Sequence, residues 1–457
     1  MFLAIRSFRF LCLVLLFSIS INNLFSANYK QINLPQFHKK SLLNGLEFLL
    51  FPSNNSRDSF ALMIRNGAAF DPINKWGLTY LTTQMMLENT EHRTGQHIRE
   101  SLKQMNAELE FRVGWDAITF WGSAPPDRMM EVLNLLAEIV VAPQFTDETF
   151  TNLRDRLAQQ IEQELQQFTL RTSHLFMAEI FRGNPYEHSV KGTSATLANL
   201  KLTDIKKQYR KLFLPNQTQL AVEYSGNTDY FQKKIGGSWG IWRRKKPVPF
   251  TFRSHKVLDQ SKFLLIDAPD SESLFRWGKI SVTRDASEYY TLKVLEQYMM
   301  LLLPDWAEQI TTQSQIQASS ELVTRKMPGY LQLSIRATPL QLIAYFQKFQ
   351  EFVNKVHEGH IDTEKFEEAK RLAYYEIIQS LKQPKSYLTQ LLELTLYELG
   401  SNFISHYGLY LERISIEKFK KTVPKYLSIK DCVVIVAGPQ DILEPIFKNL
   451  GEVTILK

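Results

Sequence analysis

Apolar residues recur at helical spacing in two stretches that lie far apart in the chain. Residues 124–140 contain a proline followed by apolar positions three or four residues apart, and residues 337–353 repeat this order 213 residues later. The prolines are Pro126 and Pro339. The apolar pairs are Met130 with Ile343, Leu133 with Phe346, Leu136 with Phe349 and Ile139 with Phe352. Because apolar residues at this spacing line one face of a helix, both stretches are predicted to be helices.

A second, longer helix repeats at an offset of 216 residues. Its apolar positions run from Phe150 to Leu165 and again from Phe366 to Leu381, and an acidic start precedes each run. Such a start caps a helix and favours its dipole. Farther along, a predicted helix and strand ending at Gly226 correspond to a pair ending at Gly438. The chain is therefore predicted to consist of two related halves.

The predicted fold class is α+β, with two homologous domains. Strand-like runs at residues 60–65 and 117–121 are rich in β-formers, and helices join them to their neighbours. We expect each domain to be a mostly antiparallel sheet backed by helices. Glycine, proline and charged residues cluster at 236–249, which indicates a boundary there. The expected domains are residues 28–247 and 248–457.

The first 27 residues have the layout of a secretory signal peptide. Arg6 and Arg9 precede an apolar run over residues 10–21, and two asparagines follow it. This run is shorter than the about 20 residues that a spanning helix needs. We expect cleavage near residue 27, export to the periplasm or the extracellular space, and no integral membrane segment in the mature chain. An uncleaved anchor is the alternative.

Composition and charge narrow the function classes only a little. The chain is 44% hydrophobic and 22% charged, which is typical of a globular protein. Its net charge of +7 is too dilute to predict nucleic-acid binding. The basic run 242–246 is interpreted as a solvated linker. After signal cleavage Cys432 would be the single cysteine, and its apolar surroundings predict a buried, unreactive thiol.

Several short motifs, in a fixed order, connect the two halves to a known family. They are NGAAFDP (66–72), WGLTYLTTQMM (76–86), NAEL (106–109), WDAITF (115–120), PQFTDE (143–148), NPYEHSVKGT (184–193), SVTRDASEYY (281–290) and GYLQL (329–333). In this order, and together with the repeat, they resemble the insulinase/pitrilysin family of zinc peptidases. The likeness is to its short two-domain form, like mitochondrial processing peptidase subunits. It implies a clamshell, in which two bowl-like chains enclose a chamber.

The zinc site of that family is changed at every position in this chain. The family carries His-x-x-Glu-His on one helix, where two histidines reach one zinc and the glutamate activates its water. A glutamate about 76 residues later supplies the third ligand. The aligned positions here are Tyr80, Thr83, Gln84 and Gln160. None is a usual zinc ligand, and Thr83 cannot act as a general base near neutral pH. The resemblance therefore predicts no zinc cofactor and no peptidase activity in this chain alone.

Other residues provide few ligands for an alternative metal site. Glu162 and Glu164 lie close to Gln160, but they would bring carboxylates without a histidine, a set better suited to calcium or magnesium. The pair His357 and His360 falls in a predicted loop between helices. A structural role is expected for His188.

A second family feature, an arginine and a tyrosine that grip the substrate backbone, is also missing. The aligned positions hold Ala307 and Ser314, while Arg325 and Tyr330 stand nearby at a different spacing. The resemblance therefore implies that this chain contributes neither of the family's two catalytic features.

The expected role is a non-catalytic subunit that pairs with a zinc-bearing homologue and forms a peptide-binding chamber for proteolysis. Peptide would add by strand pairing to a predicted sheet edge, whose residues are Glu108, Leu109, Glu110, Phe111, Arg112 and Val113. An ordinary edge strand without a ligand is the alternative there. Two other functions stay open: a stand-alone peptide-binding or structural protein, and a metallopeptidase with a displaced zinc site.

Overall fold

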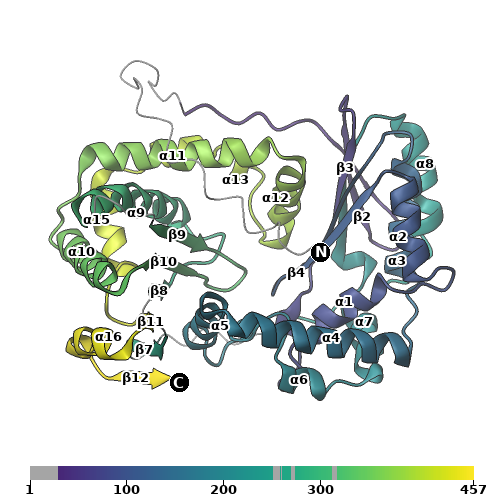
Figure 1. Cartoon of the computed structure of the whole chain (residues 1–457). Helices are drawn as coiled ribbons and strands as arrows, with labels where there is room; N and C mark the ends of the chain where they lie inside the picture. Colours follow the sequence, from purple (N-terminus) through teal and green to yellow (C-terminus); the bar gives the residue numbers. More distant parts are fainter. Residues whose placement is uncertain (1–28, 251–257, 259, 269–272, 311–315, 457) are drawn as a thin grey trace.

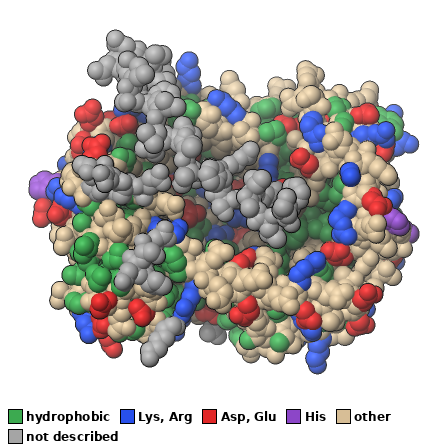
Figure 2. All heavy atoms as spheres, in the orientation of Figure 1, with side chains coloured by type: hydrophobic (Ala, Val, Ile, Leu, Met, Phe, Trp, Pro, Cys, Tyr) green, Lys and Arg blue, Asp and Glu red, His purple; other side chains and the backbone are tan. Residues whose placement is uncertain are grey.

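The computed structural model describes residues 29–250, 258, 260–268, 273–310 and 316–456. The predicted signal peptide and Ser314 lie outside this part of the chain. Two six-stranded sheets lie in separate halves of the molecule, each with helices packed on it (Figure 1). Acidic and basic side chains are interspersed over the described residues of the visible face (Figure 2), in keeping with the dilute net charge.

The first sheet is built from the N-terminal half, in the order β1-β2-β6-β3-β5-β4. The β2–β6 pair is parallel and the other neighbours are antiparallel. Strand β4 is the last strand of this sheet, as the sequence predicts. The strands are β1 (His38–Ser41), β2 (Glu47–Pro52), β3 (Asp58–Ile64), β4 (Glu108–Val113), β5 (Ile118–Ala124) and β6 (Thr218–Tyr224).

The second sheet repeats this arrangement, in the order β12-β7-β11-β8-β10-β9. Here β11 and β12 are both parallel to β7, and the remaining pairs are antiparallel. The strands are β7 (Lys262–Asp267), β8 (Ser273–Ile280), β9 (Gln317–Val323), β10 (Tyr330–Ala337), β11 (Val433–Gly438) and β12 (Val453–Leu456). The five strands from β7 to β9 match those from β2 to β4 in order, which confirms the predicted α+β fold with two homologous domains.

The helices carry the predicted repeat. Helices α3 (Met129–Val141) and α10 (Pro339–His357) contain the first pair of matched stretches, and α4 (Asp147–Gln166) and α11 (Thr363–Leu381) contain the second. Three of the four apolar pairs are buried in both halves: Leu133 with Phe346, Leu136 with Phe349, and Ile139 with Phe352. The helical spacing read from the sequence therefore marks the faces that pack onto the two sheets.

Each half also covers the sheet of the other half with one helix. Helix α5 (Phe168–Ile180), from the first half, buries Phe176 and Ile180 against residues of β7, β8 and β11. Helix α12 (Pro384–Leu396), from the second half, buries Leu388 and Leu392 against residues of β2, β3 and β6. These two helices occupy equivalent places in the repeat, so each sheet has its own helices on one face and a helix from the other half on the opposite face.

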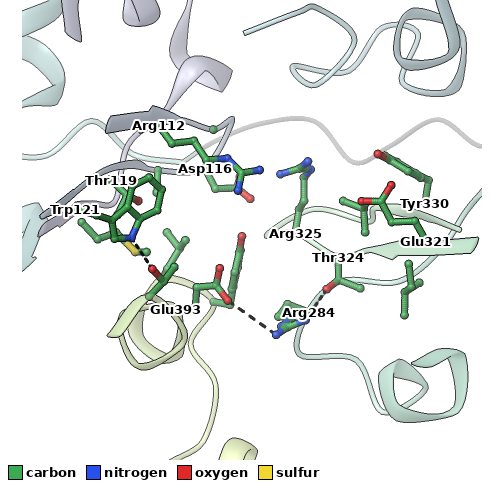
Figure 3. Close-up of a pocket in the computed structure, with 18 residues that line it drawn as sticks. Arg112, Asp116, Thr119, Trp121, Arg284, Glu321, Thr324, Arg325, Tyr330 and Glu393 are labelled. Atoms are coloured by element: carbon green, nitrogen blue, oxygen red, sulfur yellow. Dashed lines mark hydrogen bonds and ion pairs between the residues drawn. The ribbon is translucent and has the colours of Figure 1, made fainter. Parts of the chain in front are cut away.

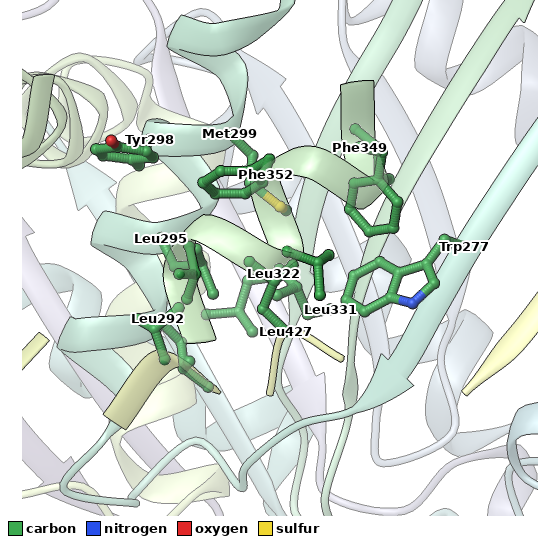
Figure 4. Packing of buried hydrophobic residues seen from close by; sticks show 14 of the residues in the cluster. Trp277, Leu292, Leu295, Tyr298, Met299, Leu322, Leu331, Phe349, Phe352 and Leu427 are labelled. Atoms are coloured by element: carbon green, nitrogen blue, oxygen red, sulfur yellow. The ribbon is translucent and has the colours of Figure 1, made fainter. Parts of the chain in front are cut away.

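The core of the second half contains the cysteine. Aromatic and aliphatic side chains from α9 (Tyr289–Ile310), α10 and the sheet pack together, and Trp277 lies beside Phe349 at one side of this cluster (Figure 4). Cys432 belongs to this cluster and is fully buried, and burial raises the pKa of its thiol to about 11. A buried thiol with a raised pKa is a poor nucleophile, which agrees with the expected structural role.

Of the two histidines predicted to lie in a loop, His360 is in the loop between α10 and α11, whereas His357 is the last residue of α10. The Nε2 atom of His357 lies 3.0 Å from the carbonyl oxygen of Leu427, while His360 is exposed beside Glu358. The pair therefore lies at a helix end and in the loop predicted from the repeat. Among the described residues, no helix combines the length and apolar character needed to cross a membrane.

Candidate functional site

The helix that would carry the zinc ligands is α1 (Leu78–Met86), and a buried aspartate fixes its start. The carboxylate of Asp71 accepts hydrogen bonds from the backbone N–H groups of Gly77 and Thr79, both at 3.0 Å. Gly77 has a φ of +92°, and a Cβ atom there would lie 2.4 Å from the carbonyl oxygen of Lys191. Only glycine fits this position, so α1 starts directly against the segment that carries Lys191.

Three of the four changed positions lie on α1 and do not form a ligand set. Tyr80 is half-buried and its ring contacts Phe111 of β4, with centroids 5.8 Å apart. Thr83 is fully buried and its hydroxyl donates to the carbonyl oxygen of Thr79 at 2.8 Å. The Oε1 atom of Gln84 is buried, with no hydrogen-bond partner in the described part of the chain. The tyrosine thus joins this helix to the predicted peptide-binding strand.

The fourth position, Gln160 on α4, is exposed, and the carboxylate next to it is already neutralised. The side-chain amide of Gln160 donates to Glu164 Oε1 at 2.8 Å, and Lys191 Nζ contacts the same oxygen at 2.6 Å. Glu164 lies close enough to Tyr80 that burial and this carboxylate together raise the pKa of the phenol. We call Tyr80, Gln84, Gln160, Glu164 and Lys191 the vestigial site.

The carboxylates near Gln160 do not combine into a metal site. Glu164 pairs with the ammonium of Lys191, and Glu162 accepts a hydrogen bond from the hydroxyl of Ser194. A divalent cation would have to displace Lys191 from Glu164. Over the described ranges, no three His, Cys, Asp or Glu side chains are grouped so as to hold a metal ion.

His174 on α5 lies close enough to the vestigial site to sense its charges, and sequence reasoning missed it. It is half-buried, and burial lowers its pKa below the ordinary value. Glu164 acts to raise this pKa and Lys191 acts to lower it further. No motif marks this histidine, although α5 begins directly after α4, the helix that carries Gln160 and Glu164.

The pKa of His174 therefore depends on the ion pair between Lys191 and Glu164 in the vestigial site. Replacing Lys191 with Met removes a nearby positive charge, so the pKa of His174 should rise. Replacing Glu164 with Gln removes a negative charge, so the pKa should fall. Titration of the imidazole by NMR measures both shifts. The exposed Lys103→Met on α2 (Gly95–Gln104) is the matched control and should leave the titration unchanged. Shifts in the same direction for both variants would contradict the placement of the pair.

His188 has the structural role expected from the sequence. It is 4% exposed, its ring stacks on Trp76 at 5.2 Å, and its Nδ1 atom lies 2.9 Å from the carbonyl oxygen of Ser189. Burial lowers its pKa, which favours the neutral ring.

A polar cavity of about 370 Å³ lies between the two halves (Figure 3). Its walls come from β4 and β5, from β9 and the turn that follows it, and from α12. The side chains of Arg112, Asp116, Arg325 and Glu393 converge on it from these different elements. Arg112 and Asp116 are close in the sequence, but Arg325 and Glu393 are far from them and from each other, so only the fold brings the group together. Sequence reasoning found Arg112, through the predicted edge strand, and missed the rest as a group.

Two of the cavity's charged groups are held by partners. Asp116 accepts hydrogen bonds from the hydroxyl of Tyr186 and from the backbone N–H of Lys326, the latter at 3.1 Å. Glu393 pairs with Arg284 at 3.9 Å. Burial raises the pKa of both carboxyl groups, although the cavity's arginines oppose the shift at Glu393.

The other two arginines are available to a ligand. Arg325 stacks on the Trp115 ring at 4.4 Å, and its buried Nε atom has no hydrogen-bond partner among the described residues. Arg112 is exposed and has no carboxylate within ion-pair distance in the part of the chain described. Because guanidinium groups bind carboxylates strongly, this side of the cavity suits an anionic group.

Strand β4 reaches this cavity with Arg112, and β5 is its one strand neighbour among the described residues. Leu109, Glu110 and Phe111 are half-buried, Glu108 and Arg112 are exposed, and Val113 is buried. Glu110 pairs at 2.6 Å with Lys385 of α12, so a helix from the second half stands beside the strand. The predicted peptide-binding strand is therefore a sheet edge that faces the other half.

The positions aligned with the family's arginine and tyrosine lie elsewhere. Ala307 is on α9 and packs against the core of the second half, and Ser314 is outside the described residues. Arg325 and Tyr330, which have a different spacing in the sequence, do line the cavity. A guanidinium and a phenol therefore do line the cavity, from a segment later in the chain than the aligned one.

Comparisons with known proteins agree with this architecture. Residues 51–194 match the sequence model of the family "Insulinase (Peptidase family M16)". The non-peptidase homolog YmxG of Helicobacter pylori is 22% identical over 217 residues, which are 46% of this chain and 50% of that protein. The mitochondrial-processing peptidase subunit beta of Caenorhabditis elegans is 17% identical over 45% of this chain and 44% of that protein. These matches span about half the length of the curated relatives.

Solved structures match over most of the chain. A peptidase M16 inactive domain from Pseudomonas fluorescens has a TM-score of 0.78 at 16% identity, covering 88% of this chain and 98% of that one. The periplasmic protease PqqL from Escherichia coli has a TM-score of 0.73 at 13% identity, covering 93% of this chain and 51% of that one. At such low identity these likenesses show the fold. This chain therefore carries an insulinase-family (peptidase family M16) domain in residues 51–194, within a two-domain M16-like fold.

Proposed function

We propose that this chain is a non-catalytic insulinase-family subunit that pairs with a zinc-bearing homologue and binds peptide between its two halves. The observation that carries the proposal is the contrast between the two parts of the site. All four positions of the zinc site hold other residues, and a lysine neutralises the nearby carboxylate. The edge strand β4 and a cavity at its end are nevertheless present.

The proposed ligand is an extended peptide that adds to β4 by backbone hydrogen bonds. Strand pairing gives affinity without regard to sequence, and side chains near the strand supply preference. Arg112 extends from β4 itself, and Arg325 reaches the cavity from the second half. Since neither guanidinium has a carboxylate partner in the described residues, a peptide with an acidic side chain at this point is favoured.

Replacing Arg112 with Ala should weaken binding of a fluorescent acidic peptide about tenfold, because a hydrogen bond to a charged group contributes about 1.5–3 kcal/mol. A peptide of the same length with the acidic residues changed to their amides should bind wild type and variant alike. Fluorescence anisotropy measures both. The exposed Lys103→Ala, on α2 away from the cavity, is the charge-matched control. Equal losses for the acidic and the amide peptide would contradict this preference.

Two further parts of the proposal concern the partner and the compartment. Two curated or solved relatives are named as a processing-peptidase subunit and a periplasmic protease, which supports a paired and exported protein. We propose export after removal of residues 1–27, and amino-terminal sequencing of the exported chain tests it. A chain that still begins before Arg6 would rule out this signal peptide.

A further inference from the structure

A surface on the outer side of the first half combines exposed apolar side chains with a concentration of positive charge. Leu43 is fully exposed at 104%, Ile241 is 70% exposed and Tyr230 is 51% exposed. We define the basic–apolar surface by these three side chains and the exposed cations around them. The cations are Lys40, Lys233, Lys234, Arg243, Arg244, Lys245 and Lys246.

The parts of this surface are held together by specific contacts. Asn44, in the turn between β1 and β2, donates from its side-chain amide to the carbonyl oxygens of Trp239 and Trp242, at 2.9 and 3.0 Å. Both indole side chains are buried, so they anchor the end of α8 (Thr228–Trp239) and the residues after it. The turn that presents Leu43 is therefore fixed against the segment that presents Ile241.

Further contacts join the basic run to the same turn. The side-chain amide of Asn216 donates to the carbonyl oxygen of Lys245 at 3.1 Å. A Cβ atom at Gly45, which has a φ of +88°, would lie 2.8 Å from Cβ of Asn216. Lys40 Nζ lies 3.3 Å from the carbonyl oxygen of Gln232 on α8. The turn, the helix end and the basic run thus form one continuous surface.

The charge on this surface is not neutralised by the chain itself. Arg243, Arg244, Lys245 and Lys246 are exposed, and none has a carboxylate partner in the part of the chain that the structure describes. Asp229 is the one acidic residue between positions 228 and 246. Lys39, by contrast, pairs with Glu47 at 2.9 Å and is not counted here. The interpretation of residues 242–246 as a solvated linker explains neither this concentration of charge nor the exposed apolar side chains beside it.

We propose that the basic–apolar surface docks this protein onto an anionic phospholipid bilayer. Exposed apolar side chains stabilise the bound state when they enter the headgroup region. Each lysine or arginine beside anionic lipids stabilises it by about 1 kcal/mol. Nucleic acid fits this surface less well, because Leu43 and Ile241 would stay in water. The contacts that carry this inference do not involve the peptide site or the zinc positions, so it stands apart from the proposed function.

The orientation of the surface leaves the cavity open. Helix α8 buries Phe231, Ile235 and Trp239 against one face of the first sheet, and α12 covers the opposite face. In Figure 1, α8 lies on the outer side of the first half, away from the second sheet. A membrane bound along α8 and the turn at Leu43 would therefore leave the space between the halves accessible to peptide.

Vesicle co-sedimentation tests the proposal with the whole chain as its host processes it. Vesicles of phosphatidylcholine and phosphatidylglycerol (3:1) are compared with pure phosphatidylcholine, at low and high salt. The anionic vesicles should bind the chain, and salt should weaken binding. Replacing all four residues 243–246 with Gln should lower the partition coefficient about a hundredfold or more, and Leu43→Ser about tenfold.

Matched variants control for net charge and apolar exposure elsewhere. One replaces four exposed lysines of the second half, Lys355, Lys382, Lys421 and Lys425, with Gln; the other is Leu340→Ser, at a side chain 74% exposed. Both should bind as wild type does. Equal losses for the test and control variants, or equal binding to both kinds of vesicle, would overturn the proposal. So would tighter binding to duplex DNA, or to an acidic protein partner, than to the anionic vesicles. Leu43→Ser lies in an exposed turn and keeps the test independent of folding.

Discussion

Phe176→Ala should lower the free energy of unfolding by about 3–5 kcal/mol, the usual cost of removing a fully buried phenylalanine. Phe176 comes from α5 of the first half and is 1% exposed against the second sheet. A Cβ atom on Gly278 would lie 2.3 Å from the phenyl ring, so the ring fills the space that this glycine leaves. It also meets Tyr330 edge-to-face, with centroids 5.3 Å apart.

Urea denaturation followed by tryptophan fluorescence measures this loss. Leu175→Ala, at the half-buried neighbour on the same helix, is the control and should cost less than half as much. Because α5 holds one half against the other, Phe176→Ala should shift the unfolding of both halves. If Phe176→Ala lowered the free energy of unfolding no more than Leu175→Ala does, α5 would not be the helix that holds the two halves together.

The second large effect concerns zinc. The chain purified without chelator should contain less than about 0.1 zinc ion per molecule and should cleave no peptide, because it lacks two histidines and a glutamate that would bind the ion. The triple variant Tyr80→His, Gln84→His and Gln160→Glu restores those ligand types on α1 and α4. With Lys191→Met added, zinc should rise to about one ion per chain.

Elemental analysis after gel filtration measures the zinc content. The triple variant that keeps Lys191 is the matched control, and it should bind zinc more weakly because the ammonium, which lies beside position 160, repels the cation. About one zinc ion in the wild-type chain, lost when Tyr80, Gln84 or Gln160 is replaced, would show that these positions hold the metal and would contradict the prediction.

The repeat could be predicted because burial imposes a period on the sequence. The faces of α3 and α10 that carry Leu136 and Phe349 pack on equivalent sheets, so the same spacing recurs. The exchange of α5 and α12 between the halves could not be predicted. An apolar helix face shows that a helix is covered, and it does not show which sheet covers it.

The part of the candidate site that lies within a single sequence motif could be predicted. Tyr80 and Gln84 stand on one helix at ligand spacing, so their substitution is visible in the sequence. The cavity is different, since Arg112, Asp116, Arg325 and Glu393 come from segments whose approach depends on the packing of both halves. The pairing of Lys191 with Glu164 also depends on tertiary contacts between a loop and α4.

In the proposed function, this chain contributes binding, and not chemistry, to a two-chain peptidase. The most direct measurement mixes the purified chain with a zinc-bearing insulinase-family homologue from the same host, and follows mass and peptide cleavage together. We expect a complex with one copy of each chain, no cleavage by this chain alone, and a lower KM for the homologue in the complex. Failure to associate with every such homologue, or cleavage by this chain alone, would contradict it.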